Sequence, residues 1–113
     1  MHQLGIAQEI LDTALETGKK EGAHKITSVH VKAGQSAIED VADLRSCFDV
    51  IKASTIAAEA DLVVETIPLA AACRLCKTSF SPQRPRAVCP ACGSSEVEIT
   101  GGRELYVDSV ELV

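Results

Sequence analysis

Residues 73–92, CRLCKTSFSPQRPRAVCPAC, are the most informative part of the sequence, because they hold two C-x2-C pairs separated by twelve residues. Two residues between the cysteines of a pair let both sulfurs turn toward one ion, as tetrahedral zinc requires. Gly93 follows the second pair, where such a knuckle favours a positive φ, and Lys77 stands at the equivalent place after the first. The spacing predicts a structural zinc ribbon whose ligands are Cys73, Cys76, Cys89 and Cys92. A rubredoxin-like iron site, disulfides and free thiols stay open as alternatives.

The sequence around these pairs predicts an inserted unit. Residues 71–102 hold four of the five cysteines and three of the four prolines, but few large apolar side chains. Such a segment needs a metal to hold it together, because it cannot bury a sufficient hydrophobic core. We expect a zinc-ribbon domain over residues 70–100, inserted into a main domain formed by residues 1–69 and 101–113.

The rest of the chain shows the periodicities of two helices and three strands. Apolar residues recur at helical spacing, and β-branched residues alternate elsewhere. Ser36 followed by Glu39 predicts a capping box for the second helix. The strand near the C-terminus loses its alternation at Asp108–Ser109. We predict helices over 4–21 and 38–53, and strands over 25–32, 60–67 and 103–113. These elements and the aliphatic composition suit a compact α/β or α+β unit with a small inserted subdomain.

Composition narrows the class of function. The chain is 46 % hydrophobic but only 3 % aromatic, so its core must be aliphatic. A net charge of −5 argues against nucleic-acid binding, which needs basic residues to neutralise phosphates. We see no secretory signal and no membrane span. No phosphate-binding loop, catalytic triad or HExxH motif is present. We expect a cytoplasmic protein that is not an enzyme and that binds neither membrane nor nucleic acid.

The first three residues, Met1-His2-Gln3, form a pre-assembled chelator. The terminal amine, the deprotonated amide of His2 and its imidazole close two rings on one metal, and the Gln3 backbone amide could complete a square plane. Tetragonal nitrogen ligation suits Ni(II) and Cu(II), whereas zinc favours a tetrahedron. A Met-His start is also frequently incidental. His24 and His30 read as surface or strand-packing residues.

The whole chain resembles the HypA/HybF family of nickel-insertion accessory proteins for [NiFe]-hydrogenase maturation. The resemblance rests on the Met-His start, on the two cysteine knuckles with CPACGS (89–94), and on four further segments: GAHKITSV (22–29), GQSAIEDVADLRSCFD (34–49), ADLVVETIP (60–68) and GRELYVDSVE (102–111). Coverage is essentially end to end.

The resemblance implies an α+β fold, with two helices packed on a three-stranded sheet and an inserted four-cysteine zinc-ribbon subdomain, in which residues 1–69 and 101–113 form a nickel-binding domain. It implies a metallochaperone that binds Ni(II) through Met1 and His2 as cargo and keeps Zn(II) as a structural ion. Delivery would be to the hydrogenase large subunit, together with the GTPase HypB, and some relatives also serve urease maturation. Asp40 matches a family acidic position and is a weak candidate for an outer nickel ligand. Gln3 departs from the family, which usually has Glu there. Strand exchange into a homodimer is conceivable.

A second hypothesis is a zinc-ribbon interaction module, binding protein or nucleic acid, whose Met-His start is incidental. It would act through the basic residues of the ribbon, and nickel would bind no better than to any exposed histidine. Those residues are Arg74, Lys77, Arg84 and Arg86.

Overall fold

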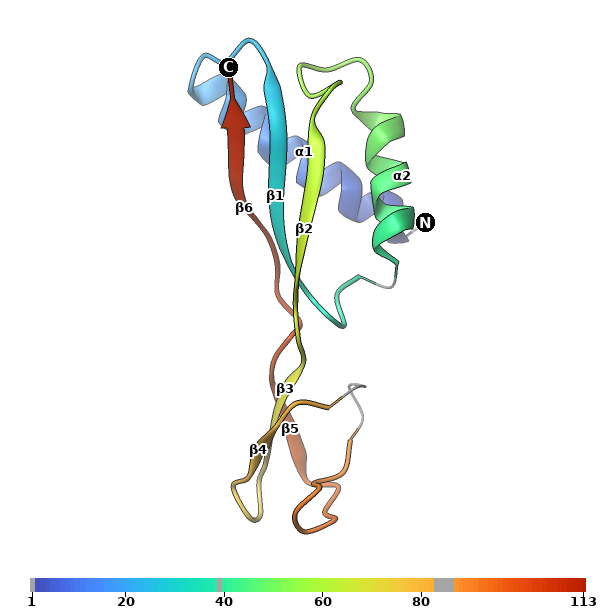
Figure 1. Cartoon of the computed structure of the whole chain (residues 1–113), viewed down its shortest axis with the longest axis vertical. Helices are drawn as coiled ribbons and strands as arrows, with labels where there is room; N and C mark the ends of the chain where they lie inside the picture. Colours follow the sequence, from blue (N-terminus) through green and yellow to red (C-terminus); the bar gives the residue numbers. More distant parts are fainter. Residues whose placement is uncertain (1, 39, 83–86) are drawn as a thin grey trace. The chain divides into compact units, whose positions relative to one another are not determined.

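The computed structural model describes residues 2–38, 40–82 and 87–113, with the side chain of His2 left out. The elements, in chain order (Figure 1), are α1 (His2–Lys20), β1 (Ile26–Gly34), α2 (Val41–Ile51), β2 (Asp61–Ile67), β3 (Ala70–Cys73), β4 (Ser79–Phe80), β5 (Val97–Gly101) and β6 (Leu105–Leu112).

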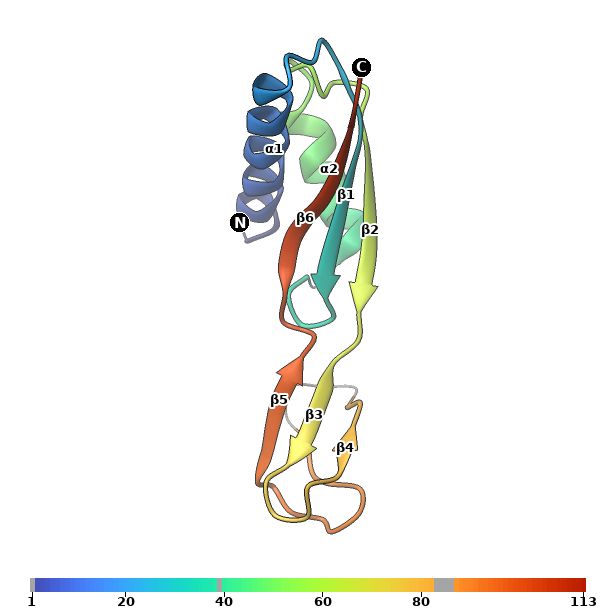
Figure 2. The same cartoon turned by 90° about the vertical axis from the view of Figure 1, so that its left-hand side faces the viewer.

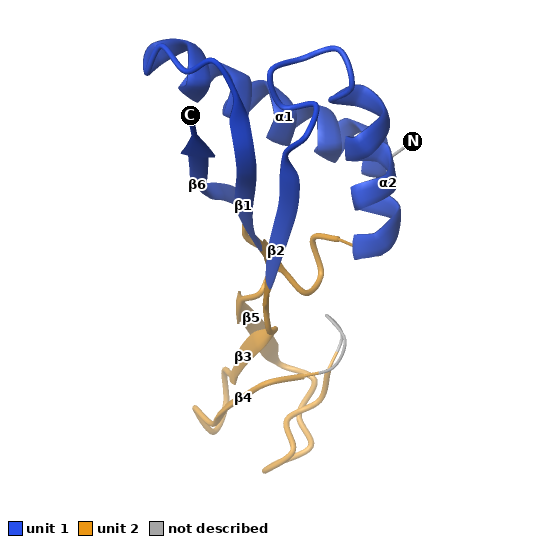
Figure 3. Ribbon diagram, turned by 45° about the horizontal axis from the view of Figure 1, so that its top comes forward, with its two compact units in different colours: residues 1–32, 40–65, 106–113 blue, residues 33–39, 66–105 orange. Residues whose placement is uncertain are grey.

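The chain forms two compact units (Figure 3). The helical unit comprises residues 1–32, 40–65 and 106–113, and the ribbon unit comprises residues 33–39 and 66–105. The ribbon unit is thus inserted in the chain and also takes in the loop that follows β1. The domain boundaries predicted near residues 70 and 100 stay a prediction, because compactness alone does not show which segment folds independently.

Both helices lie on one face of a three-stranded sheet in the order β2-β1-β6 (Figure 2). The arrowheads of β1 and β2 point the same way and that of β6 points the other way. Because α2 links the parallel strands β1 and β2, this part is a βαβ crossover to which β6 adds an antiparallel edge. The predicted α+β fold, with two helices on three strands, is confirmed.

The core of the helical unit is aliphatic apart from Phe48, as the composition predicts. The largest side chains that it buries completely are Phe48, Leu44, Ile26, Val29 and Val31. Burying each such side chain stabilises the fold by about 1.5–3 kcal/mol. On β1 the buried valines alternate with the half-buried His30 and Lys32. One face of the sheet therefore packs on the helices and the other carries polar groups.

The predicted capping box is wrong. The N-cap of α2 is Asp40, at φ −145°, and its carboxylate accepts hydrogen bonds from the backbone amides of Ala42 (2.9 Å) and Asp43 (3.2 Å). The Ser36 hydroxyl instead donates to the carbonyl of Gly102 (2.9 Å). The helix starts at Val41 rather than at residue 38, because Asp40 supplies the side-chain acceptor that a helix start requires. Glu39 lies outside the described residues.

Three chain segments cross tightly where the ribbon unit begins and ends. A side chain at Gly34 would collide with the backbone of Gly102, and one at Gly102 would lie 2.5 Å from Cα of Leu69. Gly102 also has φ +92°, a conformation that L side chains rarely adopt. The Gln35 amide donates to the Ile67 carbonyl (2.8 Å) and binds the loop to this crossing.

The ribbon itself is a second three-stranded sheet, in the order β4-β3-β5, with both pairings antiparallel. Ala72 pairs with Ser79 on one side and with Glu98 on the other. Our sequence analysis located this unit by its cysteines but did not predict its strands. In the described ranges 2–38, 40–82 and 87–113, no helix has the length and apolar character needed to span a membrane.

Candidate metal sites

The two cysteine pairs form two knuckles of the same geometry. In the first, the Lys77 amide donates to the Cys73 carbonyl (3.1 Å), and the Cys73 amide donates to the Thr78 carbonyl (2.9 Å). The second repeats this pattern, with Gly93 bonded to Cys89 (2.8 Å) and Cys89 bonded to Ser94 (2.9 Å). Lys77 has φ +65° and Gly93 has φ +74°. The positive φ expected at Gly93 is confirmed, and Lys77 adopts it as well despite its side chain.

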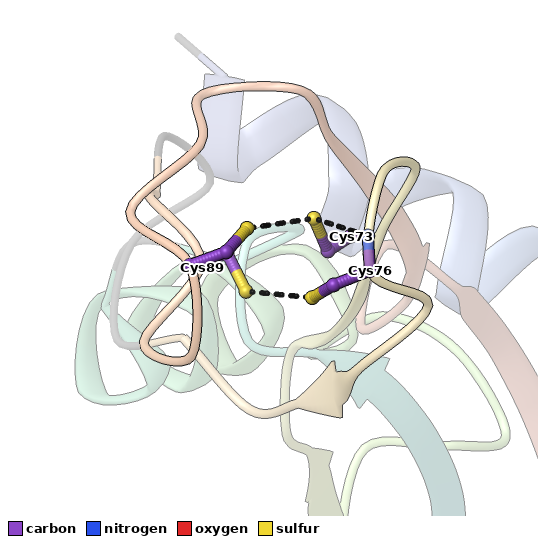
Figure 4. Close-up of side chains that lie close together, drawn as sticks. Cys73, Cys76 and Cys89 are labelled. Carbon is purple, nitrogen blue, oxygen red and sulfur yellow. Dashed lines mark hydrogen bonds between the residues drawn. The ribbon is translucent and has the colours of Figure 1, made fainter.

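The four cysteine sulfurs gather around one point (Figure 4). Sγ of Cys73 lies 3.6 Å from Sγ of Cys92, Sγ of Cys76 lies 3.5 Å from Sγ of Cys89, and all four lie within 4.8 Å of one another. A zinc ion bonded at about 2.3 Å to four tetrahedral thiolates sets the sulfurs about 3.8 Å apart. The cluster therefore fits zinc, and its four sulfurs fill every tetrahedral position.

Hydrogen bonds and the closeness of the four sulfurs lower the pKa of one thiol and raise that of another. The Thr78 hydroxyl lies 3.2 Å from Sγ of Cys76, and its hydrogen bond lowers the pKa of that thiol to about 6. The Ser94 backbone amide also favours the Cys92 thiolate, but the neighbouring cysteines, Cys73 first, outweigh it and raise the Cys92 pKa to about 12. Four thiolates cannot share so small a volume without a cation, so this donor set calls for a metal.

Sequence analysis missed the contribution of Thr78 and Ser94 to this site. Each follows the positive-φ residue of its knuckle, at the same position in both pairs. Thr78 acts on Cys76 through its hydroxyl, whereas Ser94 acts on Cys92 through its backbone amide and its own hydroxyl accepts from the Glu96 amide (3.0 Å). A hydroxyl residue directly after Lys77 was therefore a usable sequence signal, and the backbone contribution of Ser94 was not. The Arg84 and Arg86 positions of the interaction-module hypothesis lie outside the described residues, whereas Arg74 and Lys77 are exposed.

The N-terminal candidate site lies at the start of α1, which begins at His2. Met1 and the side chain of His2 lie outside what the structure describes. The Gln3 side chain is only 8 % exposed, and its amide oxygen and nitrogen have no hydrogen-bond partner among the described residues. Oδ1 of Asp40 accepts the hydrogen bonds that cap α2, so the carboxylate already has a structural role. Its role as a nickel ligand stays a prediction.

The other histidines lie apart from the cysteine cluster along the chain. His24 is exposed, and its backbone amide donates to the Val113 carbonyl (2.8 Å). The imidazole of His30, on β1, lies 3.0 Å from both the Ser28 hydroxyl and the Glu111 carboxylate. Among the described residues, the four cysteines are the one group of three or more metal-ligating side chains close enough to share an ion.

The chain is similar to known proteins over its whole length. Residues 1–112 match the family described as "Hydrogenase/urease nickel incorporation, metallochaperone, hypA". Hydrogenase maturation factor HypA of Prosthecochloris aestuarii is 33 % identical over 113 residues, covering 99 % of each chain. The factor of the same name from a Synechococcus species is 35 % identical over 113 residues, covering all of both chains.

Solved structures agree with this similarity. The solution structure of the Ni metallochaperone HypA from Helicobacter pylori matches with a TM-score of 0.69 at 28 % identity, covering 100 % of this chain and 98 % of the other. A second solution structure, described as HypA protein, matches with a TM-score of 0.73 at the same identity. The similarity spans both the helical and the ribbon unit, so the zinc-ribbon motif alone does not account for it.

Proposed function

The chain belongs to the HypA family, and from that premise we propose that it is a carrier of Ni(II) for [NiFe]-hydrogenase maturation. Nickel is bound at the N-terminus by the Met1 amine, the backbone amide and imidazole of His2, and the Gln3 backbone amide. It is passed to the hydrogenase large subunit with the help of a HypB-type GTPase. The protein works in the cytoplasm and is not itself an enzyme.

The observation that supports this proposal most strongly is the start of α1 at His2. The first four backbone amides of an α-helix have no acceptor within the helix. The amides of His2 and Gln3 are therefore not needed for the helical hydrogen-bond ladder, and a metal can replace their protons without breaking the helix. A chelate of one amine, two amide nitrogens and one imidazole has the tetragonal nitrogen geometry that Ni(II) prefers.

The four cysteines hold a structural zinc ion in this proposal. Their sulfurs leave no open tetrahedral position, so zinc folds the ribbon and does no chemistry. The alternative is an iron ion in the same cluster. Metal analysis of the purified protein distinguishes the two, since zinc is expected and iron would support the alternative.

A carrier has to release its metal, and a site at a chain terminus suits release because a receiving protein can approach it. Protons compete with nickel for the amine, the amides and the imidazole. Nickel affinity should therefore fall between about pH 7.5 and 5.5, where imidazole takes up a proton.

The test is a calorimetric nickel titration of the untagged protein beside the same chain with its terminal amine acetylated. Acetylation removes the amine as a ligand and leaves every side chain in place, whereas one added glycine would place the histidine third and create a new amine-amide-imidazole chelator. We expect a one-to-one site in the native chain that is lost in the acetylated chain. His24→Gln in the native chain is the matched control, because it removes an exposed imidazole and should leave the site intact.

Equal nickel binding by the native and the acetylated chains would refute the terminal site. The interaction-module hypothesis would then lead, with Arg74 and Lys77 of the ribbon as its first residues to test.

A further inference from the structure

The face of the three-stranded sheet that no helix covers has a hollow lined by charged and apolar side chains. Both helices cover the opposite face (Figure 2), and the helix-free face has a hollow of about 340 Å³. The hollow is lined by His30, Val31, Lys32, Val63, Glu65 and Asp108, from all three strands.

We propose that this face is a docking surface for a basic segment of a partner protein, which places an arginine side chain in the hollow between Glu65 and Asp108. The inference concerns a partner-binding surface of the helical unit. It goes beyond the proposed nickel site and does not depend on it.

The charged side chains on this face differ in their exposure to solvent. The side chain of Glu65 is 69 % exposed and that of Glu111 is 66 % exposed. Asp108 is 44 % exposed, close to the bases Lys32 at 38 % and His30 at 34 %. An approaching group therefore meets the carboxylates of Glu65 and Glu111 first. This order selects a cationic partner, and it disfavours a nucleic acid.

Lys32 pairs with the carboxylates on either side of it at long distances, so each carboxylate keeps free acceptor positions. Its Nζ lies 3.6 Å from the Glu65 carboxylate and 4.0 Å from that of Asp108, which is longer than a good charge-assisted hydrogen bond of about 2.8 Å. Asp108 first, then Glu65 and Tyr106, raise the pKa of Lys32, so the local field is negative even at the lysine. Each carboxylate can accept two further hydrogen bonds from a planar guanidinium.

Exposed apolar side chains complete the surface. Tyr106 is 47 % exposed and Val63 is 41 % exposed, and they flank the charged centre from β6 and β2. Tyrosine and arginine are both enriched in binding hot spots, and arginine stacks well on an aromatic face. Parallel strand pairs such as β1 and β2 are also usually covered on both faces, whereas here one face has no cover from the chain itself.

Tyr106 makes the test direct, because it is the only tyrosine and the chain has no tryptophan. The probe is the peptide acetyl-Gly-Arg-Gly-Arg-Gly-amide, titrated at low salt into the zinc-loaded full chain while tyrosine fluorescence is recorded. We expect a saturable change in emission. Glu65→Gln combined with Asp108→Asn should weaken binding about fivefold or more, since each exposed ion pair contributes modestly.

The matched control is Glu9→Gln combined with Glu16→Gln, which removes two exposed carboxylates from α1 and should leave peptide binding unchanged. Lys32→Gln should act in the opposite direction and tighten binding about twofold, because it removes the cation that competes for the hollow. A gain in affinity cannot come from misfolding. Equal weakening by both double variants, or a peptide that binds without affecting Tyr106, would overturn the proposal.

Discussion

Replacing the buried Gln3 with methionine should stabilise the protein. Methionine keeps the unbranched shape and the helix propensity of glutamine. It removes two polar atoms, Oε1 and Nε2, which have no hydrogen-bond partner among the described residues, from a side chain that is 8 % exposed. Glutamine at an exposed helix position would carry no such cost, because water would serve both atoms.

The size of the gain follows from the cost of unsatisfied polar groups. Each buried donor or acceptor without a partner costs about 1–3 kcal/mol, so the two amide atoms set an upper limit of about 6 kcal/mol. Local relaxation recovers part of this cost, and we expect a gain of about 1–3 kcal/mol. At about 4 °C per kcal/mol for a domain of this size, Tm should rise by about 4–12 °C.

The assay is thermal unfolding by circular dichroism of the zinc-loaded protein, with Gln8→Met as control. Gln8 lies on the exposed face of α1 and donates to Asp12 at 2.8 Å, so its loss should lower stability by only about 0.5 kcal/mol or less. Nickel affinity of Gln3→Met should equal that of the native chain, because residue 3 is proposed to contribute only its backbone amide. A lower Tm would refute the reasoning on burial, and a lost nickel site would refute the proposed role of the backbone amide.

Three further predictions concern the ribbon unit. Gly102→Ala should cost about 3 kcal/mol or more in urea unfolding, because φ is +92° and the new Cβ would lie 2.5 Å from the neighbouring backbone. Gly22→Ala, at φ +65° in open space, should cost only about 1 kcal/mol, and equal costs would contradict the close crossing. Backbone amides, that of Arg103 first, lower the pKa of Glu104, so its stabilisation is present above pH 4.5 and is lost as pH falls through the lowered value. Glu104→Gln should therefore make stability less dependent on pH in this acidic range, and unchanged acid unfolding would disprove the assignment. Thr78→Val removes the hydrogen bond that favours the Cys76 thiolate, so protons should displace zinc at a higher pH, as a chromogenic zinc indicator would report; an unchanged midpoint would exclude that role.

The sequence predicted those features that depend on local spacing. Paired cysteines at fixed separations bring their sulfurs together whatever the surrounding chain does, so the cluster of Cys73, Cys76, Cys89 and Cys92 was predictable. The two helices and the three strands of the helical unit followed from hydrophobic periodicity in the same way, and their packing followed from the family resemblance. Even the irregular alternation in β6 reappears, since Asp108 and Ser109 are both exposed.

Features set by tertiary contacts were not predictable. Ser36 has the spacing of a capping residue, but its hydroxyl is used by the Gly102 carbonyl, which lies 66 positions away in the chain. Gln3 precedes the buried Ile6, Ala7 and Ile10 by three, four and seven positions, so helical spacing already places it on the buried face of α1. Only the structure shows that its amide group finds no hydrogen-bond partner among the described residues. Lys77 adopts a positive φ because the knuckle that it closes requires it, against the preference of its own side chain.

The central claim, nickel at the N-terminus, is tested most directly by nickel K-edge X-ray absorption. The sample is the native chain with zinc in the ribbon and one equivalent of nickel added. The account predicts a nickel environment made only of nitrogen and oxygen neighbours, with imidazole scattering from His2 and no sulfur. A sulfur shell around nickel would place the cargo among Cys73, Cys76, Cys89 and Cys92 and would contradict the account.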